Sequence, residues 1–312
     1  MKYALSCFSV MALCLICSAH EVPVFNETQK AFLAMTPVER RAQFTDEAFR
    51  NALAAGYISS WTNPTGDEDV WTLRFRRLAG VKNMRDMGGL TGLNGRKLKT
   101  GLVFRSGGFN KNADGTGIPG ETKMTEETIA YQIANFGIKT DLDIRGWSDV
   151  AMKTSPLGDT VKLINIGSQA YAAFFGAAHR DTVRELFAVF LDQKNYPIAF
   201  HCAAGADRTG SLAYFLEALL GVSDEDLCLD WELTAFSNYN VEFAHAERYD
   251  KLVEALANNY SGNSTREKAE SFIRSCGYTD LDILKFRSIM LEPSSHDPKP
   301  YEGHRGAVSY MK

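Results

Sequence analysis

Residues 198–210 read Ile-Ala-Phe-His-Cys-Ala-Ala-Gly-Ala-Asp-Arg-Thr-Gly, and an apolar run at 211–220 follows them. The first of these residues have the apolar and aromatic character of a strand that is buried on both faces. The small residues after Cys202 are typical of a tight loop, and the next run has the length of a helix. The stretch therefore predicts a strand, a loop and the start of a helix.

The rest of the chain favours the same class of fold. Short β-like runs alternate with helical segments, and their spacing suggests crossover connections and a largely parallel sheet. We expect strands at 70–75, 102–104, 140–144, 161–166 and 198–202, and helices at 126–136 and 180–192. After Gly210 the chain is helical almost to Leu291, with Ser223 and Ser264 as N-caps. The predicted fold is α/β, with a central mostly parallel sheet flanked by helices and a helical C-terminal half.

The loop has the chemistry of an anion site. A loop that enters a helix N-terminus points successive backbone N–H groups at one place, and the helix dipole adds positive charge there. We expect the backbone of residues 203–208, which are Ala203, Ala204, Gly205, Ala206, Asp207 and Arg208, to bind a phosphate. The same field favours the thiolate of Cys202, which makes it a candidate nucleophile.

Two further side chains of the loop fit the same chemistry. The planar fork of Arg208 can grip two phosphate oxygens and stabilise a transition state. Thr209 is placed to donate a hydrogen bond to the sulfur, which helps the thiolate to leave when water hydrolyses a phosphocysteine intermediate. The alternative is a buried strand cysteine followed by an ordinary surface arginine. The full pattern of Cys202, Gly205, Arg208, Thr209 and Gly210 is far more specific than that.

The N-terminus has the pattern of a secretory signal. Lys2 precedes an apolar run at 3–16, small residues end at Ala19, and Glu21 follows soon after. The run is short for a spanning helix, so we expect cleavage near Ala19, a secreted or periplasmic protein and no stable membrane insertion afterwards; an uncleaved anchor is the alternative. The predicted parts are a signal peptide at 1–19, an N-terminal extension at 20–69 packed on the domain, a catalytic domain at 70–292 and a polar tail at 293–312.

The charge composition of the chain limits the kinds of binding partner that we expect. The formal net charge of −4 gives no global attraction for nucleic acid or an anionic membrane, so we expect neither as a partner. Phosphate recognition must come from a local site, and the expected substrate is a phosphorylated protein or a small phosphomonoester. The loop chemistry needs no metal and no cofactor.

The number of cysteines indicates that at least one of them is not in a disulfide. Three of the six lie in the segment that we expect to be removed, which leaves Cys202, Cys228 and Cys276. An odd number in an exported protein leaves at least one free thiol. Cys228 and Cys276 lie in helical patterns, where either two small buried hydrophobic residues or a disulfide between them fits.

At this point the sequence resembles the protein-tyrosine-phosphatase superfamily, and more closely its bacterial tyrosine-phosphatase family. Besides the loop, residues 83–89 read Asn-Met-Arg-Asp-Met-Gly-Gly, where that family has Asn-Phe-Arg-Asp-Leu-Gly-Gly. Residues 104–106 match its Phe-Arg-Ser element, and residues 143–145 resemble its Asp-Leu-Arg strand end. The resemblance spans about residues 81–291 and implies a mostly parallel sheet with helices covering the site.

One departure from the family bears on the substrate. Several relatives carry Lys directly before the loop Asp and are associated with phosphoinositide as well as phosphotyrosine hydrolysis. Here that position is Ala206, so an attractive contact for a polyanionic head group is missing. Phosphotyrosine is therefore the preferred substrate, and an inositol phosphate or phosphoinositide is the alternative.

The resemblance assigns the general acid to the loop itself. The familiar mobile-loop Asp, which lies upstream of the Cys in many relatives, has no match between Val161 and Arg180. Members of this family are thought to use the Asp of the loop, which makes Asp207 the candidate. The alternative is that Asp207 only caps the helix. Asp181 opens a helix, and capping explains it better.

The remaining candidates support the loop. Asp143, at the end of a predicted strand, either holds Arg208 in its working rotamer or forms a plain salt bridge. His201 should orient the loop through backbone contacts rather than bind a metal. The family match predicts a buried polar network of Arg85, Asp86 and Arg105. An aromatic group at 171–175 forms either a pocket wall or core.

The sequence therefore predicts an exported protein-tyrosine phosphatase, with an inositol phosphate or phosphoinositide phosphatase on the same scaffold as the alternative. A catalytically dead phosphate-binding module is a third hypothesis, against which intact Cys202, Arg208 and Thr209 argue. A sulfurtransferase also uses a loop cysteine, but Arg-Thr-Gly entering a helix fits phosphate better.

Overall fold

A computed structural model describes most of the chain, namely residues 22–55, 61–62, 70–78, 80–109, 124–145, 153–237 and 246–294. The expected signal peptide at 1–19 and nearly all of the polar tail lie outside the described residues. So does the stretch at 110–120, whose Gly, Asn and Asp residues predict an inserted loop. No helix within the described ranges is long and apolar enough to cross a membrane.

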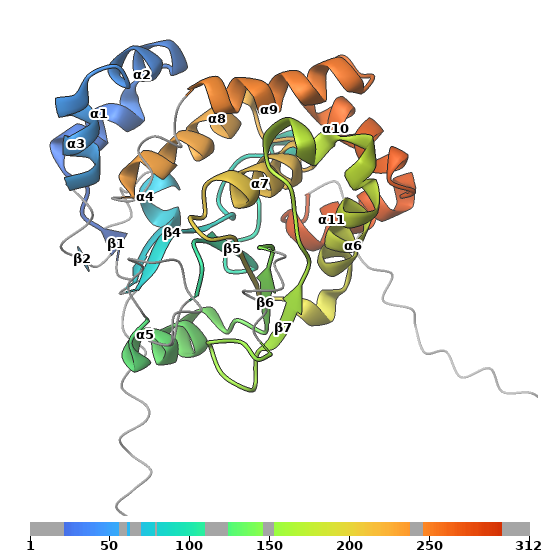
Figure 1. The fold of residues 1–312 in the computed structure, drawn as a ribbon, viewed down its shortest axis with the longest axis horizontal. Coiled ribbons are helices and arrows are strands. Elements are labelled where there is room, and N and C mark those ends of the chain that lie inside the picture. The colour runs from blue at the N-terminus through green and yellow to red at the C-terminus, as the bar shows by residue number, and fades with distance from the viewer. Residues whose placement is uncertain are drawn as a thin grey trace, which may run out of the picture.

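The centre of the fold is a six-stranded sheet in the order β3-β4-β5-β8-β6-β7. The four strands from β5 to β7 run parallel, and β3 and β4 are antiparallel to their neighbours. The prediction of an α/β fold with a mostly parallel sheet is confirmed (Figure 1). The strands are β3 (Phe75–Leu78), β4 (Val81–Asp86), β5 (Val103–Ser106), β6 (Thr140–Asp143), β7 (Lys162–Asn165) and β8 (Ile198–His201), and a separate pair joins β1 (Val22–Pro23) to β2 (Trp61–Thr62).

One strand prediction was wrong. Residues 70–74 form the short helix α4 (Val70–Arg74), and β3 begins only at Phe75. The helical turn brings residues three apart onto one face, so that the Arg74 guanidinium lies 4.9 Å from the centre of the Trp71 ring. It also turns Arg74 inward to buried carboxylates. These tertiary contacts outweigh the local preference of an apolar run for a strand.

The helical C-terminal half is confirmed. Ser223 and Ser264 are N-caps, because their hydroxyls accept hydrogen bonds from the backbone N–H groups of Asp226 and Glu267. The expected helix at 126–136 is α-helical only in its first part and continues as a π-helical turn at Gln132–Phe136. The helices are α5 (Glu126–Tyr131), α6 (Arg180–Leu191), α7 (Asp207–Leu219), α8 (Asp224–Glu232), α9 (Ala246–Asn259), α10 (Thr265–Ser275) and α11 (Asp280–Met290), with 3-10 turns at η1 (Leu93–Gly95), η3 (Tyr171–Phe175), η4 (Ala177–His179), η5 (Gln193–Asn195) and η6 (Leu233–Phe236).

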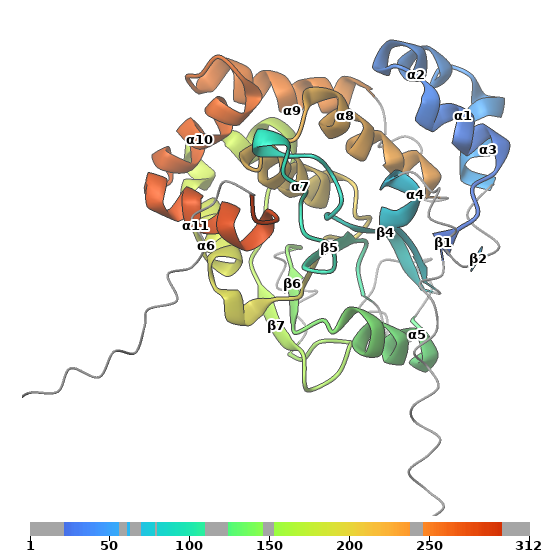
Figure 2. The ribbon, with the colours of Figure 1, turned by 180° about the vertical axis from the view of Figure 1, so that it is seen from behind.

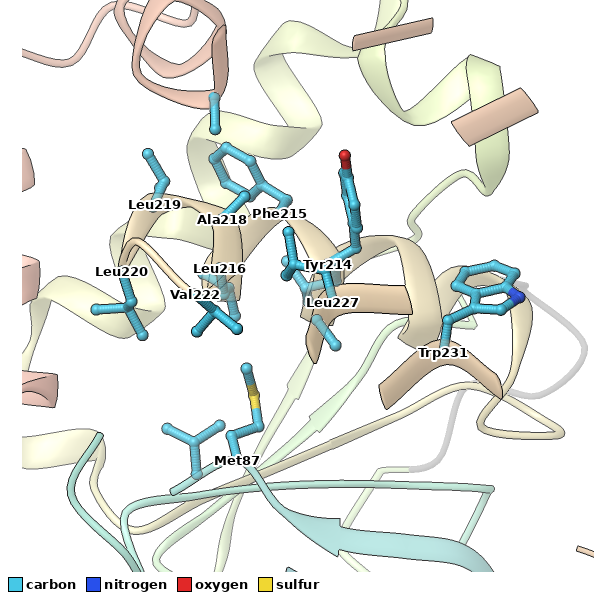
Figure 3. Close-up of a cluster of buried hydrophobic side chains, with 14 of the residues drawn as sticks. Met87, Tyr214, Phe215, Leu216, Ala218, Leu219, Leu220, Val222, Leu227 and Trp231 are labelled. Atoms are coloured by element: carbon cyan, nitrogen blue, oxygen red, sulfur yellow. The ribbon is translucent and has the colours of Figure 1, made fainter. Parts of the chain in front are cut away.

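Helix α7 is the centre of the larger hydrophobic core. Every residue from Thr209 to Leu219 is buried, since other helices cover the side of α7 that faces away from the sheet. Figure 3 shows Leu216 and Val222 on the side toward Met87, and Tyr214 and Phe215 on the opposite side. A smaller core lies beneath α5, on the other side of the sheet (Figures 1 and 2). The helix that follows the loop is therefore fixed from all sides.

Three short helices, α1 (Glu27–Ala34), α2 (Pro37–Gln43) and α3 (Glu47–Ala55), precede the sheet. The sequence at 37–55 predicts helical structure, and the structure divides these residues between α2 and α3. These helices lie beside α8 (Figure 1). A buried ion pair joins Arg40 to Glu232, and Phe32 packs edge-on against Phe236 at 5.4 Å between ring centres. The described part of the predicted extension thus packs against the helical half.

The three cysteines within the described ranges are free and buried. No disulfide joins Cys228 to Cys276, which settles the alternative that the sequence left open. Burial raises the pKa of Cys228 to about 12 and that of Cys276 to about 11. Both thiols are therefore protonated at neutral pH and behave as small hydrophobic side chains.

Candidate active site

The loop lies where the sequence predicts it, between the end of β8 at His201 and the start of α7 at Asp207. Strand β8 has a parallel neighbour on each side, β5 and β6, so three carboxyl ends meet at this edge of the sheet. Open α/β sheets bind their ligands at such an edge. We use the name phosphate loop for residues 202–208.

Gly205 makes the path of the phosphate loop possible. Its φ is +71°, which is left-handed backbone that favours glycine. A Cβ here would lie 2.5 to 2.7 Å from backbone atoms of Ser106 and Gly107, so a side chain has no room. The loop is therefore pressed directly onto the end of β5.

Cys202 is 2% exposed, and the pKa of its thiol is lowered. Burial alone would raise this pKa, but hydrogen bonds from the side chain and backbone of Thr209 outweigh it, together with the charge of Arg208 and a backbone hydrogen bond from Gly205. Thr209 also fixes the backbone, because its Oγ1 accepts a hydrogen bond of 2.8 Å from the Cys202 N–H. The predicted neighbours of the nucleophile are thus in place.

Arg208 is held by a backbone carbonyl and not by Asp143. Its Nη1 donates a hydrogen bond of 2.7 Å to the backbone carbonyl of Arg145. The Asp143 carboxylate instead accepts hydrogen bonds from Arg145. Nη2 of Arg145 donates to Oδ2 at 2.8 Å, and Nε of Arg145 donates to both carboxylate oxygens. Asp143 therefore forms the plain salt bridge that was the alternative, and it supports Arg208 only through Arg145.

His201 lies fully buried under the phosphate loop. Its Nδ1 is 3.3 Å from the carbonyl oxygen of Cys202, which is the expected backbone contact, and its Nε2 is 2.8 Å from Oδ1 of Asp141. Burial by itself would lower the pKa of His201, but the carboxylates of Asp141 and Asp143 outweigh it and raise this pKa. Ser155 donates to the other oxygen of Asp141 at 2.7 Å.

Two members of the predicted buried polar network, Arg85 and Arg105, lie together in a larger group of ion pairs, whereas Asp86 does not pair with either. We call this group the buried arginine cluster: Arg74, Arg85 and Arg105 with Asp230 and Glu217. The cluster reaches the phosphate loop, because Arg105 Nη2 donates to the carbonyl of Gly205 at 3.2 Å. Burial and the neighbouring arginines lower the pKa of Arg85 to about 10. The three cations lower the pKa of Asp230 despite its burial.

Asp86 stands apart from that cluster's carboxylates. Its carboxylate accepts hydrogen bonds from the backbone N–H groups of Gly88 at 2.8 Å and Gly101 at 2.7 Å. Its own carbonyl accepts from Nε of Arg74 at 2.8 Å. Asn83, in the same sequence motif, donates to the carbonyl of Gly205 at 2.9 Å. The motif therefore ties the turns around β4 to the phosphate loop.

Asp207 opens α7 beside the loop, with its side chain 25% exposed. Burial raises the pKa of this carboxyl, although the charges of Arg248 and Arg208 work in the opposite direction. A raised pKa keeps more of the protonated form that a general acid needs. Asp181, the other acid considered, is 83% exposed and pairs with Arg184.

The aromatic residues at 171–175 belong to the core or pack against it, which is the second of the two expected roles. Phe174 and Phe175 are core residues, each 1% exposed. Tyr171 is only partly buried, and its hydroxyl is 3.2 Å from Nη1 of Arg248. No pocket-wall role falls to the two phenylalanines.

Sequence reasoning missed several residues that the fold brings to the site or its support. They are Arg74, Asn83, Asp141, Arg145, Asp230 and Arg248. Asn83 and Arg145 carried a usable signal, since they lie in the family motifs at 83–89 and 143–145. Arg248 carried none. Within the described ranges, no group of three or more His, Cys, Asp or Glu side chains could hold a metal ion.

The fold is thus an α/β fold whose Cys-x-x-Gly-x-x-Arg loop lies between β8 and α7, at a helix N-terminus where backbone N–H groups can bind a phosphate. The model of the tyrosine phosphatase family matches residues 76–278, which is well over half of the chain. The protein belongs to the tyrosine phosphatase family. The resemblance noted in the sequence is confirmed.

Individual relatives are more distant. A Cupriavidus necator protein named "Putative tyrosine-protein phosphatase" is 30% identical over 169 residues, which cover 48% of this chain and 59% of that protein. The chain thus spans less than two thirds of the length of this relative. Among solved structures, the catalytic core of the PP-IP phosphatase Siw14 of S. cerevisiae, in complex with citrate, matches with 15% identity and a TM-score of 0.34, covering 59% of this chain and 91% of the other. A second Siw14 catalytic core matches at 14% identity and a TM-score of 0.31, over 59% and 96%.

Proposed function

We propose that this phosphatase is an exported, cysteine-dependent protein-tyrosine phosphatase that works through a phosphocysteine intermediate. The observation that carries the proposal is the environment of Cys202. A buried thiol with a lowered pKa lies at the start of the loop that leads from β8 into α7, and Arg208 and Thr209 lie in the first turn of that helix. The contrast with Cys228, whose pKa burial raises, supports a specific role for the Cys202 site.

The first chemical step would transfer the phosphoryl group to sulfur. The Cys202 thiolate attacks phosphorus, the S–P bond forms, and the P–O bond to the leaving group breaks. Arg208 and the loop N–H groups neutralise the charge on the equatorial oxygens. Asp207 donates its proton to the leaving oxygen. The products are the free alcohol or phenol and a phosphocysteine.

The second step would return the enzyme to its starting state. Water attacks phosphorus, gives up a proton to the Asp207 carboxylate and releases inorganic phosphate. Sulfur leaves as a thiolate, which the hydrogen bonds from Thr209 stabilise. The same residues thus serve both steps, and this scheme requires no metal.

Phosphotyrosine is the substrate that we propose. Ala206 is buried and apolar, so the position before Asp207 offers no cation to a polyanionic head group. Inositol phosphates are the alternative substrates that the test must include.

The test is hydrolysis of a phosphotyrosine peptide, para-nitrophenyl phosphate and inositol phosphates in EDTA. Wild type, Cys202→Ser and Arg208→Ala are compared, with Cys228→Ala as the matched control in another buried cysteine. We expect metal-independent turnover that both site variants abolish and the control keeps. Mass spectrometry of protein quenched during turnover should find the phosphoryl group on Cys202. Preferential hydrolysis of inositol phosphates would overturn the substrate, and a wild type that binds phosphate without turnover would favour a binding module.

Export rests on the N-terminal sequence pattern alone. Fractionation of cells that make the full chain, with N-terminal sequencing of the mature protein, tests it. A mature protein that begins after Ala19 outside the cytoplasm supports export. A cytosolic protein with intact Met1 contradicts it.

A further inference from the structure

A cation from the distant helix α9 reaches the proposed general acid. Nη1 of Arg248 is 3.4 Å from Oδ1 of Asp207 and 3.2 Å from the hydroxyl of Tyr171. The guanidinium also lies over the Tyr171 ring, 5.9 Å from its centre. Arg248 is 37% exposed and Asp207 25% exposed, so the contact is half-open to solvent. The contact could not be predicted from local sequence, because 41 residues separate the two side chains.

Tyr171 is fixed to the same turn of helix that carries Asp207. Its N–H donates to Oγ of Ser211 at 2.9 Å, and that hydroxyl donates to the carbonyl of Asp207 at 2.8 Å. Tyr171 has a φ of +55°, which is rare for a bulky side chain and is held only where the surroundings demand it. Its ring packs 6.1 Å from that of Trp231. The tyrosine is therefore a rigid partner for Arg248.

The surroundings of Asp207 leave Arg248 as its main external cation. The charged and titratable groups that face the carboxyl among the described residues are Arg248 on α9, Arg208 on α7 itself and, through Arg248, Tyr171 on η3. Arg208 is turned to the Arg145 carbonyl and is needed for the phosphate. Of the two cations, only Arg248 forms an ion pair with the carboxylate.

We propose that Arg248, supported by Tyr171, is a positioning residue that orients the Asp207 carboxyl and tunes its proton donation to the leaving oxygen. The proposal rests on the proposed function, because it needs Asp207 to act as the general acid. When Asp207 gives up its proton, the carboxylate that forms lies against a cation, which stabilises the product of the transfer. Burial alone would hold the proton too tightly, and Arg248 limits that effect.

The experiment compares two substrates that differ in their need for an acid. Phenyl phosphate releases a weakly acidic phenol and depends on protonation, whereas para-nitrophenyl phosphate releases a much more acidic one. The full pH profile of kcat is measured on both for wild type, Arg248→Met, Arg248→Lys and Tyr171→Phe. Lys251→Met is the matched control, because Lys251 lies one turn further along α9 in an exposed ion pair with Glu247.

We expect Arg248→Met to lose about tenfold in kcat on phenyl phosphate relative to para-nitrophenyl phosphate, which is a part of the full contribution of an acid. Removing a cation raises the pKa of a carboxyl, so the alkaline limb of the profile should move up by about one pH unit. Arg248→Lys should restore the limb because it keeps the charge. Tyr171→Phe should change the substrate ratio in the same direction by a smaller factor, and Lys251→Met should match wild type.

Two results would overturn the proposal. One is a folded Arg248→Met with the pH profile and substrate ratio of wild type. The other is an equal loss on both substrates with an unmoved alkaline limb, which indicates a structural role. If Arg248→Met does not fold, Tyr171→Phe decides by the same ratio. A wild type without turnover would refute the proposed function itself, and is distinct from either result.

Discussion

The arginines of the buried arginine cluster and Arg208, in the phosphate loop, have different kinds of partner. Arg74, Arg85 and Arg105 form ion pairs with Asp230, or with Asp230 and Glu217, and all of these groups are buried. Arg208 has no carboxylate of the described residues within ion-pair distance, and its partner is a backbone carbonyl. A carbonyl oxygen satisfies a donor without cancelling its charge. Buried carboxylates therefore largely neutralise the charges of Arg74, Arg85 and Arg105. The charge of Arg208 is not neutralised in this way and remains available to an anion.

The difference separates stability from chemistry. A buried ion pair that loses one partner leaves an uncompensated charge, which is strongly destabilising. A cation that awaits a ligand can be changed at little cost to the fold, but its loss removes transition-state stabilisation. The two groups should therefore respond oppositely to substitution.

The largest effect should come from Asp230→Asn. The change removes the common partner of three buried arginines, so we expect the free energy of unfolding to fall by about 3–5 kcal/mol. Urea denaturation followed by tryptophan fluorescence measures it. The folded fraction should keep most of its turnover. A variant as stable as wild type would contradict the stabilising role that we assign to the buried arginine cluster.

Arg208→Lys should show the reverse. Lysine keeps the charge but loses the planar fork that grips two phosphate oxygens. We expect kcat to fall by roughly 100- to 1,000-fold, the usual cost of one transition-state donor. The urea midpoint should stay near that of wild type. A large loss of stability with little loss of kcat would place Arg208 in the structural group instead.

The sequence predicted what is local along the chain. The strand, loop and helix around Cys202 are contiguous, so anion chemistry and its residues could be read together, and the signatures around Arg85 and Arg105 pointed to a supporting network. The partners of that network could not be predicted, because Arg74 and Asp230 are 156 residues apart and meet only through the fold.

The same reason explains one alternative that the sequence left open and one strand prediction that was wrong. Of the two roles predicted for Asp143, a contact with Arg208 and a plain salt bridge, the structure shows the second, because Arg145 is two residues away and competes for the carboxylate. Residues 70–74 have the composition of a strand, yet they form a helix. The helix buries Arg74 against Glu217 of α7 and Asp230 of α8, and these ion pairs outweigh the local preference. A buried charge is costly without a partner, so the need to pair it can override the structure that the local sequence pattern predicts.

Thr209→Val sharpens the comparison at the thiol. The hydrogen bond from the Thr209 side chain is the largest of the effects that lower the pKa of Cys202, so removing its hydroxyl should raise that pKa. The thiolate then forms only at higher pH. The rate of alkylation by iodoacetamide, followed against pH, should show the shift, with Arg208 still in place. An unmoved alkylation profile would mean that the helix and Arg208 alone hold the thiolate.

The smallest effect should come from Arg41→Met on the N-terminal helices. Arg41 pairs with Asp250 at 2.7 Å, as Arg40 pairs with Glu232, but the Arg41 pair is 38% and 43% exposed while the Arg40 pair is 1% exposed on each side. Water screens the exposed pair, so we expect a loss of less than about 1 kcal/mol in unfolding free energy. The loss should shrink further in high salt. A fall of several kcal/mol in the free energy of unfolding that salt does not change would contradict this prediction. It would show that the exposure of an ion pair does not determine how much its arginine stabilises the fold.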